Sequence, residues 1–221
     1  MCGRFTITVT AGLGERFGVS GADCRIEPRY NVAPSQEIPL IRDGHERRLG
    51  FLEWGLPVSW QSGRLINARA ESVLEKPIFR PLVRAGRCLV PADGFFEWDR
   101  RGGEFVPWYF RCEEGDLFAF AGLAGEDGCL IVTTPANPDV APVHDRMPVI
   151  LRREDEERWL SPGLPDREEI RELCAPLPAG ALVRHRVSLR VNDPRTDDPS
   201  LLAFVPGDHQ QTLTGLDPQD G

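Results

Sequence analysis

Glycine and proline interrupt this chain so often that it has little room for long helices. The sequence holds 22 glycines and 20 prolines in 221 residues, spread along its length at short intervals. Proline removes a helical hydrogen bond, and both residues favour turns. The runs between these breaks are rich in β-branched and aromatic residues, which is typical of strands. We expect strands at Arg4–Val9, Ile38–Arg42, Arg48–Trp54, Arg87–Val90, Phe95–Asp99, Phe105–Arg111, Leu117–Leu123, Cys129–Thr134 and Val149–Leu151.

Five segments have the pattern of short helices. They are Thr10–Phe17, Ala70–Lys76, Arg80–Ala85, Arg153–Leu160 and Asp166–Cys174, the last with an aspartate placed as its N-cap. Consecutive strands with few helices predict an α+β fold, dominated by antiparallel strands with a few short peripheral helices. A chain of this length fits one domain with a sizeable core, which we expect to span residues 1–205. The polar stretch 206–221 is expected to be a disordered tail.

The composition argues against a membrane protein and against a metal site. No apolar run approaches the roughly 18 residues that span a bilayer, and the start lacks the apolar segment of a signal peptide. We therefore expect a cytoplasmic protein without membrane contact. The six cysteines form no C-x-x-C pair and the histidines do not cluster, so neither a zinc site nor a disulfide framework is expected. No metal and no other cofactor is predicted.

The charge is unevenly distributed along the chain, whose net charge is −8. Residues 1–101 carry 15 Lys+Arg against 12 Asp+Glu, whereas residues 102–221 carry 11 against 22. The basic residues are almost all arginine, which suits bidentate phosphate contacts and stacking on bases. A local basic cleft in an otherwise acidic protein would give selective affinity for DNA instead of general affinity.

The first four residues, Met1-Cys2-Gly3-Arg4, place a cysteine where removal of the initiator methionine makes it the N-terminus. A terminal cysteine carries an α-amine and a thiol on adjacent carbons. The amine has a reference pKa of about 7.7–8.0 and the thiol one of about 8.5, so both supply some nucleophile at neutral pH. Together they condense with an aldehyde to a thiazolidine ring. The alternative is that Cys2 is a small buried hydrophobic residue on the first strand.

Further stretches combine polar groups with aromatic or small residues. They are Arg29–Pro34, Glu53–Pro57, Asn67–Glu71, Pro91–Trp98 and His144–Pro148. Each has a structural explanation when taken alone. Asn67 could cap the helix that follows it, Glu97 could be exposed on a half-buried strand, and His144 could lie in a solvated turn.

Taken together and in this order, these motifs resemble the SRAP family, the SOS-response-associated peptidase-like proteins that shield abasic sites in single-stranded DNA. The resemblance covers residue 1 to about residue 151, with weaker similarity near His185–Val191. It implies the barrel-like SRAP fold and a mature N-terminal cysteine that forms a covalent thiazolidine crosslink with the ring-opened aldehyde of an abasic site. It further implies strand-cleaving lyase activity, a preference for ss/ds junctions and self-removal of Met1, for which an aminopeptidase is the alternative. We expect a monomer.

The resemblance assigns four catalytic residues. Cys2 is the nucleophile, and Asn67 matches the asparagine that holds the cysteine and contacts the sugar. Glu97 matches the general acid/base of sugar opening and imine formation. His144 matches the histidine that assists proton transfer on the Schiff-base route and in crosslink reversal. A carboxylate and an imidazole near their working pH can perform these proton transfers.

The resemblance also implies four DNA contacts, each with a competing interpretation. Arg4 and Arg69 match phosphate-binding arginines and could equally be surface ion-pair partners. Trp60 matches an aromatic residue that wedges or stacks where the strand bends, and the alternative is a core tryptophan. Pro34 would line the DNA path or simply form a turn. Trp54 is expected in the core.

The chain departs from the family pattern in two places. Phe96 stands where family members often have tyrosine or tryptophan, which keeps the aromatic character. After Val187 the family usually has a small, polar segment, whereas this chain has Leu189–Arg195 and then Asp197-Asp198. This departure affects the expected C-terminal edge of the DNA groove and leaves the chemistry untouched.

Two other classes of function remain open on the sequence alone. An N-terminal-nucleophile hydrolase such as a glutamine amidotransferase domain also begins Met-Cys-Gly, with the thiolate attacking an amide. A non-covalent DNA-binding module, in which Cys2 is incidental, would bind DNA in a salt-sensitive way and ignore the abasic site.

Overall fold

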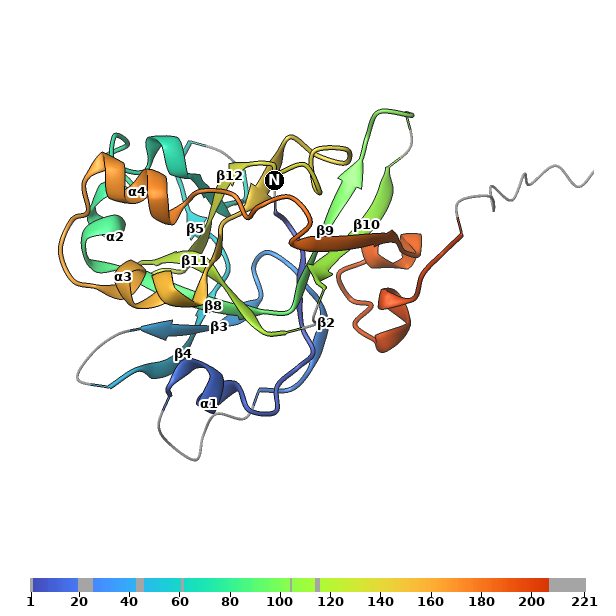
Figure 1. Cartoon of the computed structure of the whole chain (residues 1–221), viewed down its shortest axis with the longest axis horizontal. Helices are drawn as coiled ribbons and strands as arrows, with labels where there is room; N and C mark the ends of the chain where they lie inside the picture. The colour runs from blue at the N-terminus through green and yellow to red at the C-terminus, as the bar shows by residue number, and fades with distance from the viewer. Residues whose placement is uncertain are drawn as a thin grey trace, which may run out of the picture.

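The computed structural model of this protein describes residues 2–19, 26–42, 46–60, 62–103, 105–113 and 116–206 (Figure 1). Its strands are β1 Phe5–Ile7, β2 Arg29–Val32, β3 Glu37–Arg42, β4 Arg48–Glu53, β5 Leu56–Pro57, β6 Arg64–Leu65, β7 Asn67–Arg69, β8 Arg87–Ala92, β9 Gly94–Asp99, β10 Val106–Cys112, β11 Phe118–Ala124, β12 Cys129–Pro135, β13 Arg146–Pro148, β14 Ile150–Leu151 and β15 Leu182–Arg186. The α-helices are α1 Leu13–Phe17, α2 Arg80–Ala85, α3 Glu156–Leu160 and α4 Arg167–Leu173; the 3₁₀ turns are η1 Ala70–Ser72, η2 Arg153–Asp155, η3 Leu189–Asn192 and η4 Pro199–Leu202. The expected tail falls almost entirely on residues 207–221, outside the described residues.

The strands form two main sheets, as the α+β expectation requires. One sheet has the order β15-β10-β9-β1-β2, and the other has β13-β12-β11-β8-β3-β4 with β14 and β7 attached to β11 and β12. Strand pairs within the described part of the chain are antiparallel, except that β7 runs parallel to β12. The sheets do not close into a single barrel, so the barrel-like resemblance is a loose one. A separate ribbon of β5 and β6 completes the set.

A cluster of aromatic rings fills the space between the sheets. The ring of Phe5 lies 5.2 Å from that of Trp54 and 5.7 Å from that of Phe120, both in edge-on contacts. Phe95 of β9 stacks on Phe110 of β10 at 5.0 Å in the same core. These edge-to-face and offset contacts are the preferred arrangements of buried aromatic pairs. Trp54 is therefore a core residue, as predicted.

A second, smaller core lies on the opposite face of β9 and holds the C-terminal segment. Because successive side chains of a strand point to opposite faces, Phe95 enters the main core while its neighbour Phe96 faces away. The small core is formed by Phe96, Tyr109, Val187, Val191 and Leu201. The segment after Val187 that departs from the family pattern is thus packed against the back of β9.

Most of the predicted elements agree with the structure, whereas one predicted helix is wrong and several strands were not predicted. Each predicted strand overlaps an observed one, and α4 begins at the predicted cap, where Asp166 accepts a hydrogen bond from Glu169 N at 2.8 Å. The predicted helix Ala70–Lys76 is wrong, because only a 3₁₀ turn forms at its start. Pro77 disfavours helical geometry at the residue before it. The unpredicted strands are β2, β5, β6, β7, β13 and β15.

A buried carboxylate fixes the path of β1. Oδ1 of Asp93 accepts a hydrogen bond from the Thr6 hydroxyl at 2.5 Å, and Oδ2 accepts from Thr8 N at 2.5 Å, the Thr8 hydroxyl at 2.7 Å and Val9 N at 2.7 Å. The Tyr109 hydroxyl lies 3.0 Å from the Thr6 hydroxyl and extends this network. The network therefore locks the end of β1 onto the turn between β8 and β9.

We predict that Asp93→Ala lowers the free energy of unfolding by about 3 kcal/mol or more, because it leaves several buried donors without an acceptor. Chemical denaturation of the purified variant measures this loss. The matched control is Asp127→Ala at an exposed turn position, for which we expect a change within about 0.5 kcal/mol. Equal effects of the two substitutions would contradict the structural role of Asp93.

Candidate active site

The pairing of β1 with β9 brings Cys2 towards Glu97. Phe5 is opposite Phe95, and Phe96 N donates to Arg4 O at 3.0 Å. Because the strands are antiparallel, the chain before Phe5 runs along the part of β9 that carries Glu97. Burial raises the pKa of the Cys2 thiol, and the negative charge of Glu97 raises that pKa further. Cys2 is fully buried in the full-length chain, so its sulfur is held as a neutral thiol beside a carboxyl group.

Glu97 is buried and can exchange a proton near neutral pH. Its exposed fraction is 2%, so the alternative of an exposed residue on a polar face is wrong. Burial raises the pKa of Glu97 to about 7, although the charge of the chain's α-amino group and that of Arg100 act to lower it. A carboxyl group with this pKa can serve as an acid and as a base in one reaction cycle.

His144 lies in the loop before β13 and is held in a neutral form. Its Nδ1 accepts a hydrogen bond from Arg146 N at 3.0 Å, and the Asp145 carboxylate lies 3.0 Å from the same nitrogen. Burial lowers the pKa of His144, and this effect outweighs the opposing charge of Asp145. A neutral ring whose Nδ1 accepts from the backbone carries its proton on Nε2. The solvated-turn alternative does not fit this half-buried ring.

Glu97 and His144 share one electrostatic environment. The positive charge of the chain's α-amino group lowers the pKa of each, and so does the charge of Arg100. Charges act over a few ångströms in a partly buried site and are screened beyond that. Glu97 and His144 therefore belong to the same site.

Asn67 lies on the other sheet and presents an unpaired acceptor. It opens β7, with its Nδ2 donating weakly to Ile131 O at 3.4 Å, and it is 7% exposed. The following turn η1 has Arg69 at its N-cap, so Asn67 does not cap it. Its Oδ1 is buried and has no hydrogen-bond partner among the described residues. A buried acceptor left unpaired is costly and marks a place where a bound group is expected to donate.

An ion pair joins the motif of Asn67 to the motif of His144. Arg146 Nη1 lies 2.5 Å from Glu71 Oε1, and Arg146 Nη2 donates to Thr133 O at 2.7 Å. Glu71 follows β7, Arg146 opens β13, and Thr133 belongs to β12 between them. The hydrogen bond from Arg146 lowers the pKa of Glu71 and keeps it ionised. Glu71 and Arg146 each lie within one of the sequence motifs. Because they are far apart in the chain, the sequence does not predict a contact between them.

The structure separates the four predicted DNA contacts into two kinds. Trp60 is 64% exposed and Arg69 is exposed, so both are available to a ligand, and the core alternative for Trp60 is wrong. Pro34 lies half-buried in the turn between β2 and β3. Arg4 is half-buried, with Nη1 donating to Asn31 Oδ1 at 2.8 Å and to Val191 O at 2.6 Å. Arg4 is thus an anchor of the C-terminal segment and not a surface ion-pair partner.

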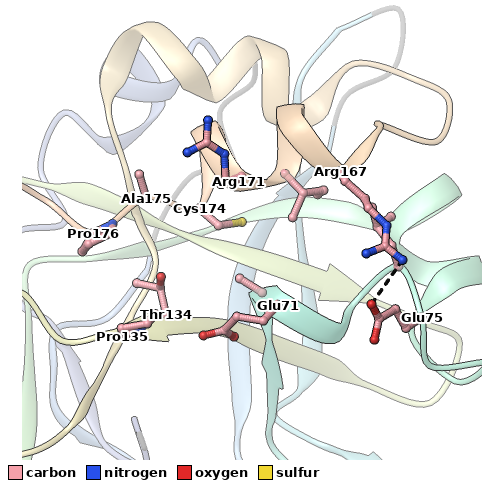
Figure 2. Close-up of a pocket in the computed structure, with 12 residues that line it drawn as sticks. Glu71, Glu75, Thr134, Pro135, Arg167, Arg171, Cys174, Ala175 and Pro176 are labelled. Carbon is pink, nitrogen blue, oxygen red and sulfur yellow. Dashed lines mark ion pairs between the residues drawn. The ribbon is translucent and has the colours of Figure 1, made fainter.

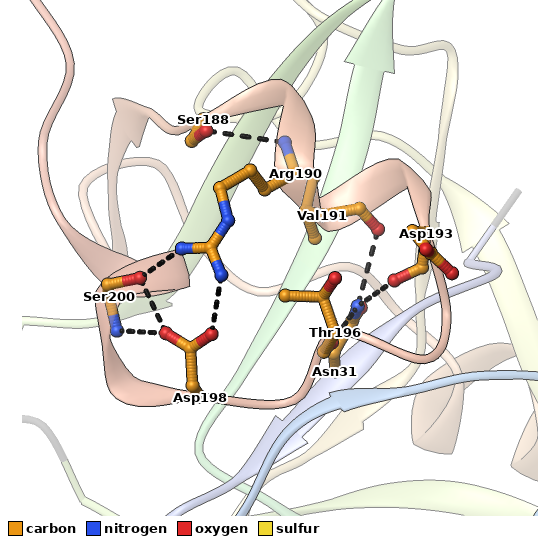
Figure 3. Close-up of polar contacts among 8 residues, drawn as sticks. All are labelled: Asn31, Ser188, Arg190, Val191, Asp193, Thr196, Asp198 and Ser200. Atoms are coloured by element: carbon orange, nitrogen blue, oxygen red, sulfur yellow. Dashed lines mark hydrogen bonds and ion pairs between the residues drawn. The ribbon is translucent and has the colours of Figure 1, made fainter.

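Asn31 also holds the C-terminal segment in place, through hydrogen bonds from its side chain (Figure 3). Its Nδ2 donates to the carbonyl oxygens of Val191, Asp193 and Thr196 at 3.3, 3.1 and 2.7 Å. Arg190 closes the next turn by donating to Asp198 Oδ2 at 2.8 Å. The segment that departs from the family pattern is therefore tied to the first strands, directly behind Arg4.

A pocket of about 520 Å³ lies next to the site, between η1, α4 and the end of β12 (Figure 2). Cys174, the C-cap residue of α4, faces it from one side and Glu71 from the other, while Arg167 and Glu75 form an ion pair of 3.3 Å at one end. Burial raises the pKa of Cys174 to about 12, so its thiol stays protonated. None of the predicted site residues lines this pocket.

The described residues contain neither a membrane-spanning helix nor a metal-binding cluster. No helix in them is long and apolar enough to cross a membrane. No group of three or more His, Cys, Asp or Glu side chains in the same residues could hold a metal ion.

Comparisons with known proteins agree on one family. The sequence model of the SOS response associated peptidase (SRAP) family matches residues 1–194. Abasic site processing protein YoqW of Bacillus subtilis is 39% identical, over 91% of this chain and 99% of its own length. Abasic site processing protein YedK of Escherichia coli is 30% identical, over 93% of this chain and all of its own. A crystal structure of a protein from Bacteroides thetaiotaomicron superposes with a TM-score of 0.76 and 25% identity, covering 93% of this chain and 100% of that chain.

We predict that Glu97→Gln stabilises the protein at alkaline pH. The folded-state pKa of about 7 lies above the ordinary 4.5, so folding favours the protonated acid. The stability from that preference is complete below about pH 4.5 and is lost as pH rises through 7. Between pH 5 and pH 8 the unfolding free energy should therefore shift in favour of the glutamine variant, by on the order of 3 kcal/mol.

Denaturant titrations at the two pH values measure this shift. Glu126→Gln, at an exposed turn position, is the matched control and should show none. A shift of the same size in both variants would mean that the pKa of Glu97 is not the one that folding raises.

Proposed function

The chain belongs to the SOS response associated peptidase family, and we propose that it captures abasic sites in single-stranded DNA through a mature, N-terminal Cys2. The observation that carries the proposal is the register of β1 on β9, which runs the chain end along Glu97. Relatives that match nearly all of this chain are named abasic site processing proteins, which supports the same substrate. The product is a crosslink that shields the damaged site.

Removal of Met1 is the first requirement. It converts the nitrogen of Cys2 from an amide into an amine, and only the amine is a nucleophile. Cys2 has no exposed surface in the full-length chain, so removal must also give the DNA access to the residue. We propose that the protein removes Met1 itself, in keeping with the peptidase name of the family; an aminopeptidase is the other route.

The amine attacks first. Its nitrogen bonds to C1′ of the ring-opened sugar, the C=O π electrons move to the oxygen, and Glu97 carries one proton from the nitrogen to that oxygen, which becomes a hydroxyl group. The Nε2–H of neutral His144 donates a hydrogen bond to the sugar oxygen and polarises it. Glu97 then takes the remaining N–H proton and passes it to the hydroxyl group, which leaves as water and yields an imine. A carboxyl group with a pKa of about 7 suits both transfers.

The sulfur closes the ring. Burial keeps the Cys2 thiol protonated through its raised pKa, and the Arg4 backbone N–H, which acts to lower that pKa, stabilises the developing thiolate. Glu97 accepts the thiol proton, the C–S bond forms at C1′, and the imine nitrogen gains a proton as the π bond breaks. One water is lost overall. The unpaired Oδ1 of Asn67 would accept from the amine of Cys2 or from a sugar hydroxyl.

The DNA path and a side reaction complete the proposal. Arg69 would bind a phosphate and Trp60 would stack on a base, because both are exposed. These contacts favour single strands and ss/ds junctions, and the protein would act as a monomer. The imine at C1′ acidifies the C2′ protons, so β-elimination with strand cleavage would compete with ring closure.

We predict a covalent product that survives denaturation. Purified protein incubated with a single-stranded oligonucleotide containing one abasic site should give a shifted band in an SDS gel. Undamaged DNA should give none, and intact mass should show that Met1 is lost. An N-terminal extension that blocks the α-amine should abolish the band.

Cys2→Ala separates the two nucleophiles in this experiment. The alanine variant keeps the amine, so we expect only a reversible imine that borohydride fixes. An equally durable adduct of this variant without borohydride would refute the thiazolidine.

Glu97 should set the pH dependence of the reaction. We predict that the wild-type crosslinking rate rises through an inflection near pH 7, as Glu97 loses its proton and becomes the base. Glu97→Gln should lower the rate by about 100-fold and remove this inflection, leaving only the titration of the amine. Single-turnover gel assays from pH 5.5 to 9 measure both effects. If the variant kept the same inflection in its pH–rate profile, the inflection would belong to an ionisable group other than Glu97.

A further inference from the structure

A tryptophan flanked by two arginines lies beside Glu97 on the same sheet. Trp108 of β10 pairs directly with Glu97 of β9 on one side and with Arg186 of β15 on the other. Paired residues of adjacent strands project from the same face, so these side chains form a row across the sheet. The guanidinium groups of Arg184 and Arg186 lie 5.6 and 5.4 Å from the centre of the Trp108 ring. Both distances are within the range of cation–π contacts.

A third arginine continues the row to the turn of the β9–β10 hairpin. The Arg100 guanidinium lies 5.2 Å from the ring centre of Phe105, whose side chain is 56% exposed. Arg100 acts on the site directly, since its positive charge lowers the pKa of Glu97 and of His144. We call Arg100, Arg184 and Arg186 the arginine strip.

The arginine strip is positively charged, whereas the part of the chain that carries Arg184 and Arg186 is acidic overall. Residues 102–221 carry twice as many acidic as basic residues, yet two of their arginines gather on one side of Trp108. The other carboxylate of β9, Asp99, is held by Arg101 through contacts of 2.9 and 2.8 Å. Arg184 donates to Asp139 O, a neutral carbonyl group, so its charge is not cancelled by that contact. The strip is a local basic surface that starts at the proposed catalytic acid.

We propose that the arginine strip binds the phosphodiester backbone of the DNA strand on the Glu97 side of the captured sugar. This inference rests on the proposed function, because it assumes that the strand enters at Glu97. Guanidinium groups bind phosphate oxygens through paired N–H donors, and cations held on aromatic faces lose little freedom on binding. The exposed ring of Phe105 offers a flat surface for an unpaired base. Charge complementarity and continuity with Glu97 therefore favour single-stranded DNA as the ligand.

The test is the salt dependence of non-covalent binding. Affinity for a fluorescent, undamaged single-stranded oligonucleotide is measured by anisotropy over a series of salt concentrations. Each phosphate contact to a single strand contributes about 0.7 to the slope of log affinity against log salt. The double variant R184Q/R186Q should bind more weakly, with a slope smaller in magnitude by about 1.4.

The matched control is R80Q/R84Q, which removes the same charge from α2. Both of its arginines are exposed, and α2 lies on the side of the molecule away from β9 and β10 (Figure 1). We expect its slope to equal that of the wild type. An unchanged slope in R184Q/R186Q, or an equal loss in both double variants, would overturn the proposal.

Two measurements separate this inference from folding and from the chemistry. Thermal unfolding shows whether the variant is folded, and R184Q alone, at an exposed position, should give half of the change in slope. The binding assay uses undamaged DNA and needs no crosslink. Failure of the wild type to crosslink would therefore refute the proposed function, while the slope would still decide the role of the strip.

Discussion

The architecture of the site depends on the pairing of β1 with β9. The position of Cys2 follows from the register of the three-residue strand that comes after it. That register is fixed by Asp93, whose carboxylate gathers hydroxyl and backbone donors from the end of β1. Gly94 is needed at the same turn, because a Cβ there would come within 2.2 Å of the Tyr109 hydroxyl. A buried hydrogen-bond network thus positions Cys2 from several residues away.

Much of the fold and a set of candidate site residues could be predicted from the sequence, whereas the environment of those residues could not. The strands that fill the core have long apolar runs, so they were predictable; β7 and β13 have three residues each and carry no periodic signal. The motif points to Glu97 but does not reveal that Glu97 is buried. The run Phe-Phe-Glu-Trp has no regular alternation of apolar and polar residues, so it does not show which side chains face the core. The pairing of Arg146 with Glu71 spans 75 residues, and spacing alone does not reveal such a contact. The stacking of Arg184 and Arg186 on Trp108 was hidden for the same reason.

Two ionisable groups of the site have raised pKa values, and for Glu97 this has a cost in stability at neutral pH. Burial raises the pKa of both Glu97 and Cys2, which means that folding disfavours their charged forms. Such strain is tolerated where the rest of the structure is well packed. Here β9 contributes Phe95 to one core and Phe96 to another, so the strand that carries Glu97 is packed on both faces. Rigid support on two sides is what a poised acid requires.

The burial of Cys2 has a consequence for the lifetime of the unprocessed polypeptide. Peroxides and other cellular oxidants attack the thiolate form of cysteine, and they need access to the sulfur. A sulfur without exposed surface and with a raised pKa offers neither. Under the proposed function, a cysteine that reacts only once is in this way protected from oxidation until Met1 is removed.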